Sequence, residues 1–337
     1  MREKLEQLCI KYDLGKLEKD PETVSGGLLH HMFHVHTTRG EYAIKVLNPD
    51  IMKRPKALSN MIHSEIISNL LKDRVSLIAA KCFEGKHVIE EDAAFYMIYD
   101  WLEGRSFFVP EITAYHCEQM GRILGKIHSA GLSVDSMKKQ ENSRDLYDWK
   151  LYLQKAEQGN AECYEILKEH LESIVDWDKA VIAGFEELSA MQVISHRDLD
   201  PKNVMWKDKQ PYIIDWEAAG YVNPYQELIE VLNYWITEED GSYSKEKFDA
   251  LLGAYTESMN ISNVNWDTVL QCSFDGMLGW LEYNVKRALG LEGSGSDEQK
   301  EGLNQTKGTI CELKKYDSQA AVLKDWIMEY VGRKYSI

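Results

Sequence analysis

The sequence has no apolar run long enough to cross a membrane. Its most apolar stretches, such as residues 95–102, are far shorter than the roughly 20 residues that a spanning helix needs. The first residues are charged and lack the apolar core of a signal peptide. The six cysteines are scattered and form no CxxC pair, which argues against a disulfide framework or a zinc site and favours reduced thiols. We therefore expect a cytoplasmic protein that makes no use of a membrane.

The sequence also has fewer basic residues than acidic ones. Against 55 Asp and Glu the chain has only 39 Lys and Arg, which gives a net charge of −16. Nucleic acid is therefore not expected as a partner, because a phosphate backbone binds to a basic face. Residues 105–337 hold most of the surplus, with 25 basic and 39 acidic residues. An acidic cleft there would attract a cationic small molecule, but the same charge can simply keep a surface soluble, and both interpretations stay open.

Short strand patterns fill the first hundred residues, and helical patterns fill the rest. The strand patterns predict a mostly antiparallel sheet with one prominent helix over residues 57–72. A Gly-Ser run marks residues 290–300 as a flexible loop. We expect an α+β fold of two lobes, residues 1–100 and residues 101–337. The helices of the second lobe are expected at residues 111–130, 143–171, 177–191, 225–237, 244–259, 267–289 and 307–331.

One run carries a chemical signature. His196–Asn203 reproduces the H-R-D-L-x-x-x-N pattern of kinase catalytic loops, and Asp215 follows on a short apolar strand. Phosphoryl transfer from a nucleotide needs a carboxylate that orients the attacking hydroxyl, and oxygen ligands that hold magnesium on the phosphates. Asp198 suits the first role, as catalytic base, while Asn203 and Asp215 suit the second, as metal ligands. An acidic turn between two strands would explain Asp198 alone, but not the whole pattern at this spacing.

Residues that could hold the phosphates of the nucleotide precede this motif. Gly26 and Gly27, between two strands, can bring backbone amides close to a phosphate, although such a pair is more often only a hairpin or a bulge. Lys45 lies in a Tyr-Ala-Ile-Lys sequence close to the pattern of the kinase β3 lysine, and Glu65 on the following helix is its expected partner. The alternative is a lysine at a strand edge that points to solvent.

The segment between the two lobes could hold an adenine ring. Such a ring needs an apolar slot, with one carbonyl and one amide from an extended backbone. We expect Asp100 and Leu102 to supply these two groups, unless the segment is a linker with no ligand role. ATP with Mg²⁺ is therefore the expected cofactor pair.

These motifs make the chain resemble the aminoglycoside phosphotransferase and choline kinase-like family over roughly residues 22–240. The resemblance implies a two-lobed, protein-kinase-like fold that uses ATP or GTP with Mg²⁺ to phosphorylate a hydroxyl of a small molecule. It also implies that Asp198 is the base, that Asn203 and Asp215 bind magnesium, and that Lys45, paired with Glu65, binds the phosphates. The matching segments are Ser25–Leu28, Tyr42–Lys45, Trp101–Gly104, Leu124–His128, the catalytic loop and Ile214–Trp216.

The chain departs from the family pattern in two places. Leu29 and His30 stand where the family often has Ser-Asn, and Arg197 and Asp200 stand in a loop that often reads His-Gly-Asp-Leu-His. A protein substrate is disfavoured by length, because only residues 216–222 precede the Asn-Pro-Tyr that opens the next helix and leave no room for an activation loop.

We therefore expect a small-molecule acceptor. An aminoglycoside-type antibiotic competes here with an amino alcohol or sugar metabolite, and the residues do not separate them; a cationic acceptor would suit the acidic surplus. The chain is expected to act as a monomer or homodimer. The alternative function is a catalytically inactive, kinase-like nucleotide-binding protein with an assembly or spore-coat role. The intact set of Lys45, Asp198, Asn203 and Asp215 argues against it.

Overall fold

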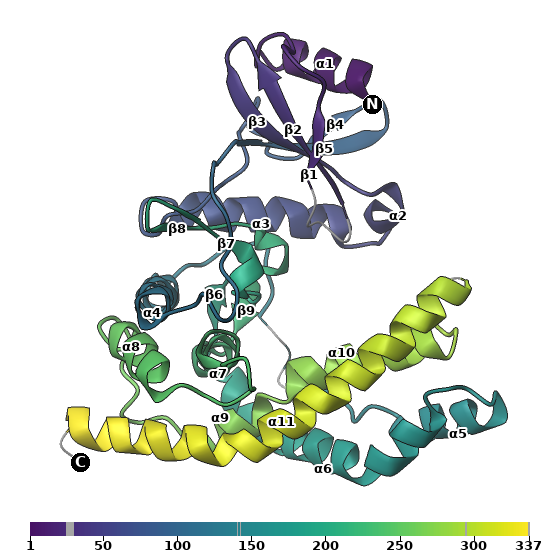
Figure 1. Cartoon of the computed structure of the whole chain (residues 1–337), viewed down its shortest axis with the longest axis vertical. Helices are drawn as coiled ribbons and strands as arrows, with labels where there is room; N and C mark the ends of the chain where they lie inside the picture. Colours follow the sequence, from purple (N-terminus) through teal and green to yellow (C-terminus); the bar gives the residue numbers. More distant parts are fainter. Residues whose placement is uncertain (25–29, 140, 142, 294, 336–337) are drawn as a thin grey trace. The chain divides into compact units, whose positions relative to one another are not determined.

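The computed structural model describes residues 1–24, 30–139, 141, 143–293 and 295–335 (Figure 1). Its internal contacts divide the chain into two compact units, each built from separate stretches. The first comprises Met1–Lys138, Ile194–Gly220 and Tyr234–Met259, and the second comprises Lys139–Val193, Tyr221–Asn233 and Asn260–Ile337. The expected boundary after residue 100 lies inside the first unit and stays a prediction.

The first unit holds a five-stranded sheet, the helices next to it and two short paired strands. In chain order its elements are α1 (Arg2–Lys11), β1 (Glu22–Val24), β2 (His31–Thr37), β3 (Gly40–Val46), α2 (Pro49–Met52), α3 (Ala57–Leu71), β4 (Ile89–Glu91), β5 (Ala94–Asp100), α4 (Ala114–His128), most of β6 (Val193–Ser195), the 3-10 turn η1 (Pro201–Asn203), β7 (Val204–Lys207), β8 (Gln210–Ile213), the 3-10 turn η2 (Trp216–Ala218) and α8 (Lys245–Tyr255).

The sheet is covered on both faces. Its strands run in the order β1-β2-β3-β5-β4, and all neighbouring pairs are antiparallel. Because side chains alternate along a strand, Ile44 and Lys45 of β3 point to opposite faces. On the Ile44 face, Leu5 of α1 joins a buried apolar cluster (Figure 1). On the other face, Met61 of α3 packs into a second cluster with Met97 of β5.

A tight turn sets the register of β2 against β3. Thr37 pairs with Gly40, so only two residues form the turn between them. Lys45 consequently lies opposite Met32 of β2 and opposite Met97 of β5. The lysine thus shares its face with these two side chains, away from α1.

Helices α4 and α8 pack in close contact because glycines face a helix backbone. A Cβ atom at Gly121 of α4 would overlap the carbonyl oxygen of Leu251 on α8. A Cβ at Gly125, one turn later, would lie 2.8 Å from the carbonyl oxygen of Tyr255. No larger side chain fits at either position without separating the helices.

The second unit is helical and contains a buried charge network. Asp178 of α6 is fully buried and accepts hydrogen bonds from Trp149 Nε1 (2.8 Å) and Tyr147 N (3.0 Å). Arg144 pairs with Asp178 at 2.7 Å and with Asp275 at 2.8 Å, which compensates the buried carboxylate. The helices of this unit are α5 (Trp149–Gln158), α6 (Tyr164–Ser189), α9 (Trp266–Cys272), α10 (Asp275–Ala288) and α11 (Ser296–Tyr335), while β9 (Gly220–Val222) and α7 (Pro224–Ile236) contribute residues to both units.

The α+β class expected from the sequence is confirmed. An antiparallel sheet occupies the N-terminal part of the chain, and helices dominate the remainder. None of the helices in the described ranges combines the length and the apolar character needed to traverse a bilayer.

Candidate active site

His196 fixes the beginning of the catalytic loop. Its ring is fully buried, and its Nε2 lies 3.0 Å from the carbonyl oxygen of Ile214. Because a carbonyl can only accept, Nε2 carries the proton, and Nδ1 is left to accept from the backbone N–H of Asp198 at 3.3 Å. One imidazole thus ties Asp198 to the residue that precedes Asp215.

Hydrogen bonds that involve helices α7 and α4 also hold the catalytic loop in place. Trp235 Nε1 donates to the carbonyl oxygen of Leu199 at 2.9 Å, directly after Asp198. The Sγ of Cys117 on α4 in turn donates to the carbonyl oxygen of Trp235 at 3.3 Å. Since Trp235 is fully buried, a shift of α4 would reach the catalytic loop through these two hydrogen bonds.

Asp198 and Asn203 are in direct contact. The Asn203 amide nitrogen donates to both the backbone oxygen of Asp198 (2.8 Å) and its carboxylate Oδ2 (2.9 Å). Lys202 Nζ lies 3.5 Å from the same Oδ2. These contacts restrict the Asp198 carboxylate, and they leave the amide oxygen of Asn203 as the atom that can ligate a cation.

Arg197 and Asp215 have left-handed backbones, with φ of 65° and 58°. Such a conformation costs a non-glycine residue about 1–3 kcal/mol and is typical of functional sites. The backbone N–H of Ile214 donates to the carbonyl oxygen of Asn203 at 3.0 Å, which places the Asp215 segment beside the end of the loop. The structure therefore brings the three predicted residues Asp198, Asn203 and Asp215 to one place.

Lys45 meets two carboxylates there. Its Nζ lies 3.3 Å from Asp215 Oδ1 and donates to Glu217 Oε1. Burial would lower the pKa of Lys45, but the two carboxylates outweigh burial and raise it. Burial would raise the pKa of Glu217, but the nearby His30 and Lys45 lower it from 4.5 to about 2. Lys45 and Glu217 are therefore both charged at neutral pH, and the lysine is held over the oxygen cluster.

His30 borders the same cluster. The backbone N–H of Asn48 donates to His30 Nδ1 at 2.9 Å, so the proton of the neutral ring is on Nε2. This Nε2 is buried and lies 3.6 Å from Glu217 Oε2, which is beyond an ordinary hydrogen bond. A buried donor thus faces the carboxylate that Lys45 also contacts.

Glu65 does not contact Lys45 in the structure. Its carboxylate accepts from the backbone N–H of Ala80 (2.7 Å), from Ser68 Oγ (3.2 Å) and from Tyr99 Oη (3.3 Å). Burial raises its pKa despite these hydrogen bonds. Lys45 thus pairs with Asp215 and Glu217 in place of the expected Glu65, because those two carboxylates lie within reach of its ammonium group.

The connecting segment runs beside β7. Asp100 ends β5 opposite Tyr42, and its exposed carboxylate binds Lys81 Nζ at 2.7 Å. Leu102 comes two residues later, and the segment reaches the strand just beyond Gly104: Trp206 N donates to Arg105 O at 2.8 Å, and Arg105 N donates back to Trp206 O at 3.2 Å. The segment expected to hold adenine is therefore joined to the strand that begins after Asn203.

Two of the predicted residues, Gly26 and Gly27, lie outside the described residues. Two further residues, Glu217 and His30, lie at the cluster but were not predicted for the nucleotide site. The signal for Glu217 was its spacing two residues after Asp215, where an acid on the same short turn can share a cation.

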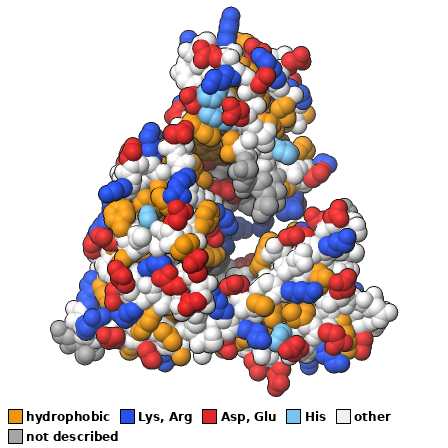
Figure 2. All heavy atoms as spheres, in the orientation of Figure 1, with side chains coloured by type: hydrophobic (Ala, Val, Ile, Leu, Met, Phe, Trp, Pro, Cys, Tyr) orange, Lys and Arg blue, Asp and Glu red, His pale blue; other side chains and the backbone are white. Residues whose placement is uncertain are grey.

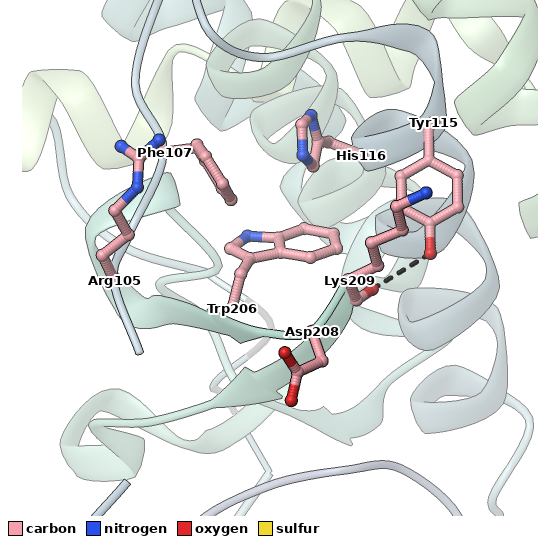
Figure 3. A pocket seen from close by; sticks show the side chains of 7 residues that line it. All are labelled: Arg105, Phe107, Tyr115, His116, Trp206, Asp208 and Lys209. Atoms are coloured by element: carbon pink, nitrogen blue, oxygen red, sulfur yellow. Dashed lines mark hydrogen bonds between the residues drawn. The ribbon is translucent and has the colours of Figure 1, made fainter. Parts of the chain in front are cut away.

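A separate pocket of about 500 Å³ lies by β7 and shares no residue with the carboxylate cluster. Figure 3 shows the Trp206 indole at its centre, with Phe107, Tyr115 and His116 around it. Tyr115 Oη donates to the carbonyl oxygen of Lys209 at 3.0 Å (Figure 3). The aromatic rings pack against one another at centroid distances of 4.6–6.2 Å, so this pocket is a depression over an aromatic cluster.

The oxygen cluster is chemically suited to a hard cation. Asn203, Asp215 and Glu217 offer only amide and carboxylate oxygens, the donor type that Mg²⁺ prefers over the nitrogen and sulfur ligands of softer metals. Lys45 adds the positive charge that phosphate oxygens need. The arrangement can therefore hold a metal-chelated triphosphate beside a carboxylate, Asp198.

Comparisons with known proteins agree with this chemistry. The model of the "Phosphotransferase enzyme family" matches residues 20–260. A homoserine kinase of Parvibaculum lavamentivorans is 25% identical over 256 residues, which is 76% of each chain. Among solved structures, a spectinomycin phosphotransferase bound to ADP and spectinomycin has a TM-score of 0.70 at 13% identity. The match covers 91% of this chain and 94% of the phosphotransferase chain. A choline kinase from Cryptosporidium parvum has a TM-score of 0.61 at 13% identity, with 97% and 99% covered. At these identities the solved structures show that the fold is shared.

Proposed function

Because this chain belongs to the phosphotransferase enzyme family and is a small-molecule kinase with an alcohol acceptor, we propose that it transfers the γ-phosphoryl group of ATP, with Mg²⁺, to a hydroxyl of a small amine-bearing molecule. The observation that carries the proposal is the convergence of Lys45, Asp198, Asn203 and Asp215 on one site from segments far apart in the chain.

Asp198 acts as the base in this proposal. Its carboxylate is half-buried and is held by the Asn203 amide and by Lys202, so one oxygen can face the acceptor hydroxyl. It orients the hydroxyl and accepts its proton as the oxygen attacks the γ-phosphorus, while the bond from this phosphorus to the bridging oxygen breaks and ADP leaves. Such a base contributes about 10²–10⁴-fold to a rate.

Asn203, Asp215 and Glu217 would hold the magnesium ion. The ion, when bound, neutralises charge on the phosphates during transfer. Asn203 can ligate through its amide oxygen because its amide nitrogen is engaged with Asp198. The left-handed backbone at Asp215 directs its carboxylate from the end of β8 to the position where Lys45 lies.

Lys45 binds the phosphates and Glu65 is its second partner in the nucleotide-bound state. Glu65 is buried and fixed by Ala80 and Ser68, and it shares Tyr99 as a neighbour with Asp215 and Glu217. With Asp215 and Glu217 engaged in holding the metal, the ammonium group of Lys45 would need another anion, and Glu65 would supply one. The His30 Nε2–H is placed to steady Glu217 or to donate to a phosphate oxygen.

Asp100 and Leu102 supply the adenine contacts, and Gly26 and Gly27 the backbone amides for the phosphates. The support for the first pair is the antiparallel contact between Arg105 and Trp206, which joins the end of the segment to β7, the strand that follows Asn203. The support for the second pair is the sequence alone. ATP is preferred in this proposal because one carbonyl and one amide match the edge of adenine.

An amine-bearing acceptor is supported by charge and by the relatives. The chain carries a net charge of −16, and such a surplus raises the local concentration of cations. On the face that Figure 2 shows, acidic side chains are interspersed with basic ones. Homoserine, choline and spectinomycin, named in the relatives, all combine a hydroxyl with a nitrogen group. The free thiols of all six cysteines support the cytoplasm as its place of action.

A mass-spectrometric screen tests the proposal. The purified chain is incubated with ATP and Mg²⁺ and with homoserine, choline, ethanolamine, an aminoglycoside panel or simple sugars, and products are searched for the gain of one HPO₃. We expect a gain on at least one amine-bearing alcohol, and none with the Asp198→Asn variant. A gain only on neutral sugars would contradict the acceptor class. If no compound gained HPO₃ although the chain bound ADP, the result would favour a nucleotide-binding protein without transfer activity.

A further inference from the structure

The outer end of strands β2 and β3 carries three potential metal ligands. His34 and His36 are two residues apart on β2, so their rings project from the same face of the sheet. Glu41 of β3 is the direct cross-strand partner of His36. One ring nitrogen of His34, one of His36 and one carboxylate oxygen of Glu41 lie within 4.8 Å of one another. Figure 2 shows histidine side chains at the surface over this sheet.

The spacing of these donors suits one tetrahedral ion. Zinc binds imidazole nitrogen and carboxylate oxygen at about 2.0–2.2 Å, so two ligands at a tetrahedral angle are separated by roughly 3.3 Å. Glu41 Oε2 lies 2.9 Å from His34 Nε2, and Glu41 Oε1 lies 3.5 Å from His36 Nδ1. The two separations involve different oxygens of the Glu41 carboxylate and lie on either side of the required value. Rotation of the Glu41 side chain would be needed to bring one of its oxygens to that separation from both ring nitrogens.

The ligands are also held in position before an ion arrives. The His34 ring stacks on Trp101, with a centroid distance of 3.6 Å and an interplanar angle of 7°. The backbone carbonyl of Glu41 accepts from the backbone N–H of Trp101 at 3.1 Å, which fixes the strand that carries the carboxylate. The side chain of His34 is only 10% exposed and that of His36 16% exposed, so little rotational freedom is lost on binding.

We propose that His34, His36 and Glu41 form a binding site for one zinc-class transition-metal ion, with water as the fourth ligand. Two imidazoles and one carboxylate form the donor set of open zinc sites, in which three protein ligands leave one position free. Mg²⁺ is disfavoured because it requires six oxygen ligands. This site shares no residue with the oxygen cluster at Asp215, although Trp101, which packs on His34, lies between the two residues proposed to contact adenine.

Calorimetric titration tests the site. The full chain, without an affinity tag and stripped with a chelator, is titrated with ZnCl₂ in excess Mg²⁺ so that the oxygen cluster is occupied. We expect uptake of one ion per chain. Loss of a supporting residue alone weakens metal sites about 10–100-fold, so His36→Asn and Glu41→Gln should each weaken binding by at least about tenfold. His31→Asn is the matched control, because His31 lies on the same strand but on the opposite face, and it should bind zinc as the natural chain does.

Thermal unfolding gives a second readout that is independent of activity. Because the ion binds the folded chain, saturating zinc should raise the unfolding temperature of the natural chain, but not that of a His34→Asn/His36→Asn double variant. Trp101 reports the event directly: its fluorescence should change on binding, and the change should disappear in Trp101→Phe. Equal zinc affinity in the natural chain and the double variant, or no uptake by the natural chain, would overturn the proposal.

Discussion

The close contact between α4 and α8 allows a quantitative test through Gly121→Ala. The added methyl carbon would overlap the carbonyl oxygen of Leu251 and lie 2.8 Å from its carbonyl carbon and 3.0 Å from its Cα. These are backbone atoms inside a helix, and they cannot rotate away as a side-chain end could. The two helices must therefore move apart, or α4 must bend.

The expected cost is set by two opposing terms. Replacing glycine by alanine inside a helix gains about 1 kcal/mol of helix propensity. Overpacking a filled interior costs about 1–3 kcal/mol, and a clash with rigid backbone belongs at the upper end. We expect a net loss of about 2 kcal/mol in the free energy of unfolding, which corresponds to a fall of about 4–8 °C in the unfolding temperature of a unit of this size. Because Cys117 and Trp235 join α4 to Leu199, turnover should fall as well.

The control is Gly253→Ala on α8 itself. A Cβ at Gly253 meets nothing within 4 Å, so this variant should gain up to about 1 kcal/mol and leave turnover unchanged. Both variants are compared with the natural chain by calorimetry and by steady-state kinetics. A Gly121→Ala variant as stable as Gly253→Ala would refute the helix contact, and a destabilised variant with full turnover would refute the connection to the catalytic loop.

Three further predictions concern the site. Asp198→Asn should lower turnover by about 10²–10⁴-fold while ADP affinity, measured by calorimetry, stays within a factor of two or so; unchanged turnover would remove Asp198 as the base. Glu217 has a pKa lowered from 4.5 to about 2, so its ion pair stabilises the fold above pH 4.5 and this stabilisation is lost as the pH falls toward 2. The natural chain should therefore lose more stability than Glu217→Gln over this range, by at most about 3 kcal/mol, and parallel acid-unfolding curves would contradict the pairing with Lys45. His30→Leu should raise the KM for ATP more than His30→Gln, because glutamine can still offer an N–H near the Nε2 position; equal kinetics in the two variants would exclude a donor role.

The sequence revealed those site residues whose relation is local. Asp198 and Asn203 are five positions apart, and a loop of that length brings them together in any fold that forms it. Asp215 could be predicted for the same reason, because the short hairpin of β7 and β8 connects it to the catalytic loop. The pairing of Lys45 with Glu217 joins residues 172 positions apart, and no local pattern encodes it. Glu65 was expected to pair with Lys45 because it lies on the helix that follows the lysine strand, and Asp215 and Glu217 pair with Lys45 in the structure.

The apolar spacing alone predicted one helix closely, although no side chain caps its N-terminus. The helix expected over residues 57–72 is α3, Ala57–Leu71. The single helix expected over residues 267–289 is broken at residues 273–274 into α9 and α10, although no glycine or proline marks the break. The flexible loop expected over residues 290–300 ends early, because α11 begins at Ser296 with acidic residues in its first turn, where the helix dipole favours them.

The two-residue turn between β2 and β3 constrains how this chain can diverge. Side chains alternate with a period of two, so an insertion or deletion of one residue that shifted the pairing would exchange the faces of a whole strand. Lys45 would then project into the apolar cluster below α1, and His34 would leave the face that Glu41 shares. Thr38 and Arg39 can thus change in identity, but a change in their number that shifts the pairing by one residue would disrupt both sites.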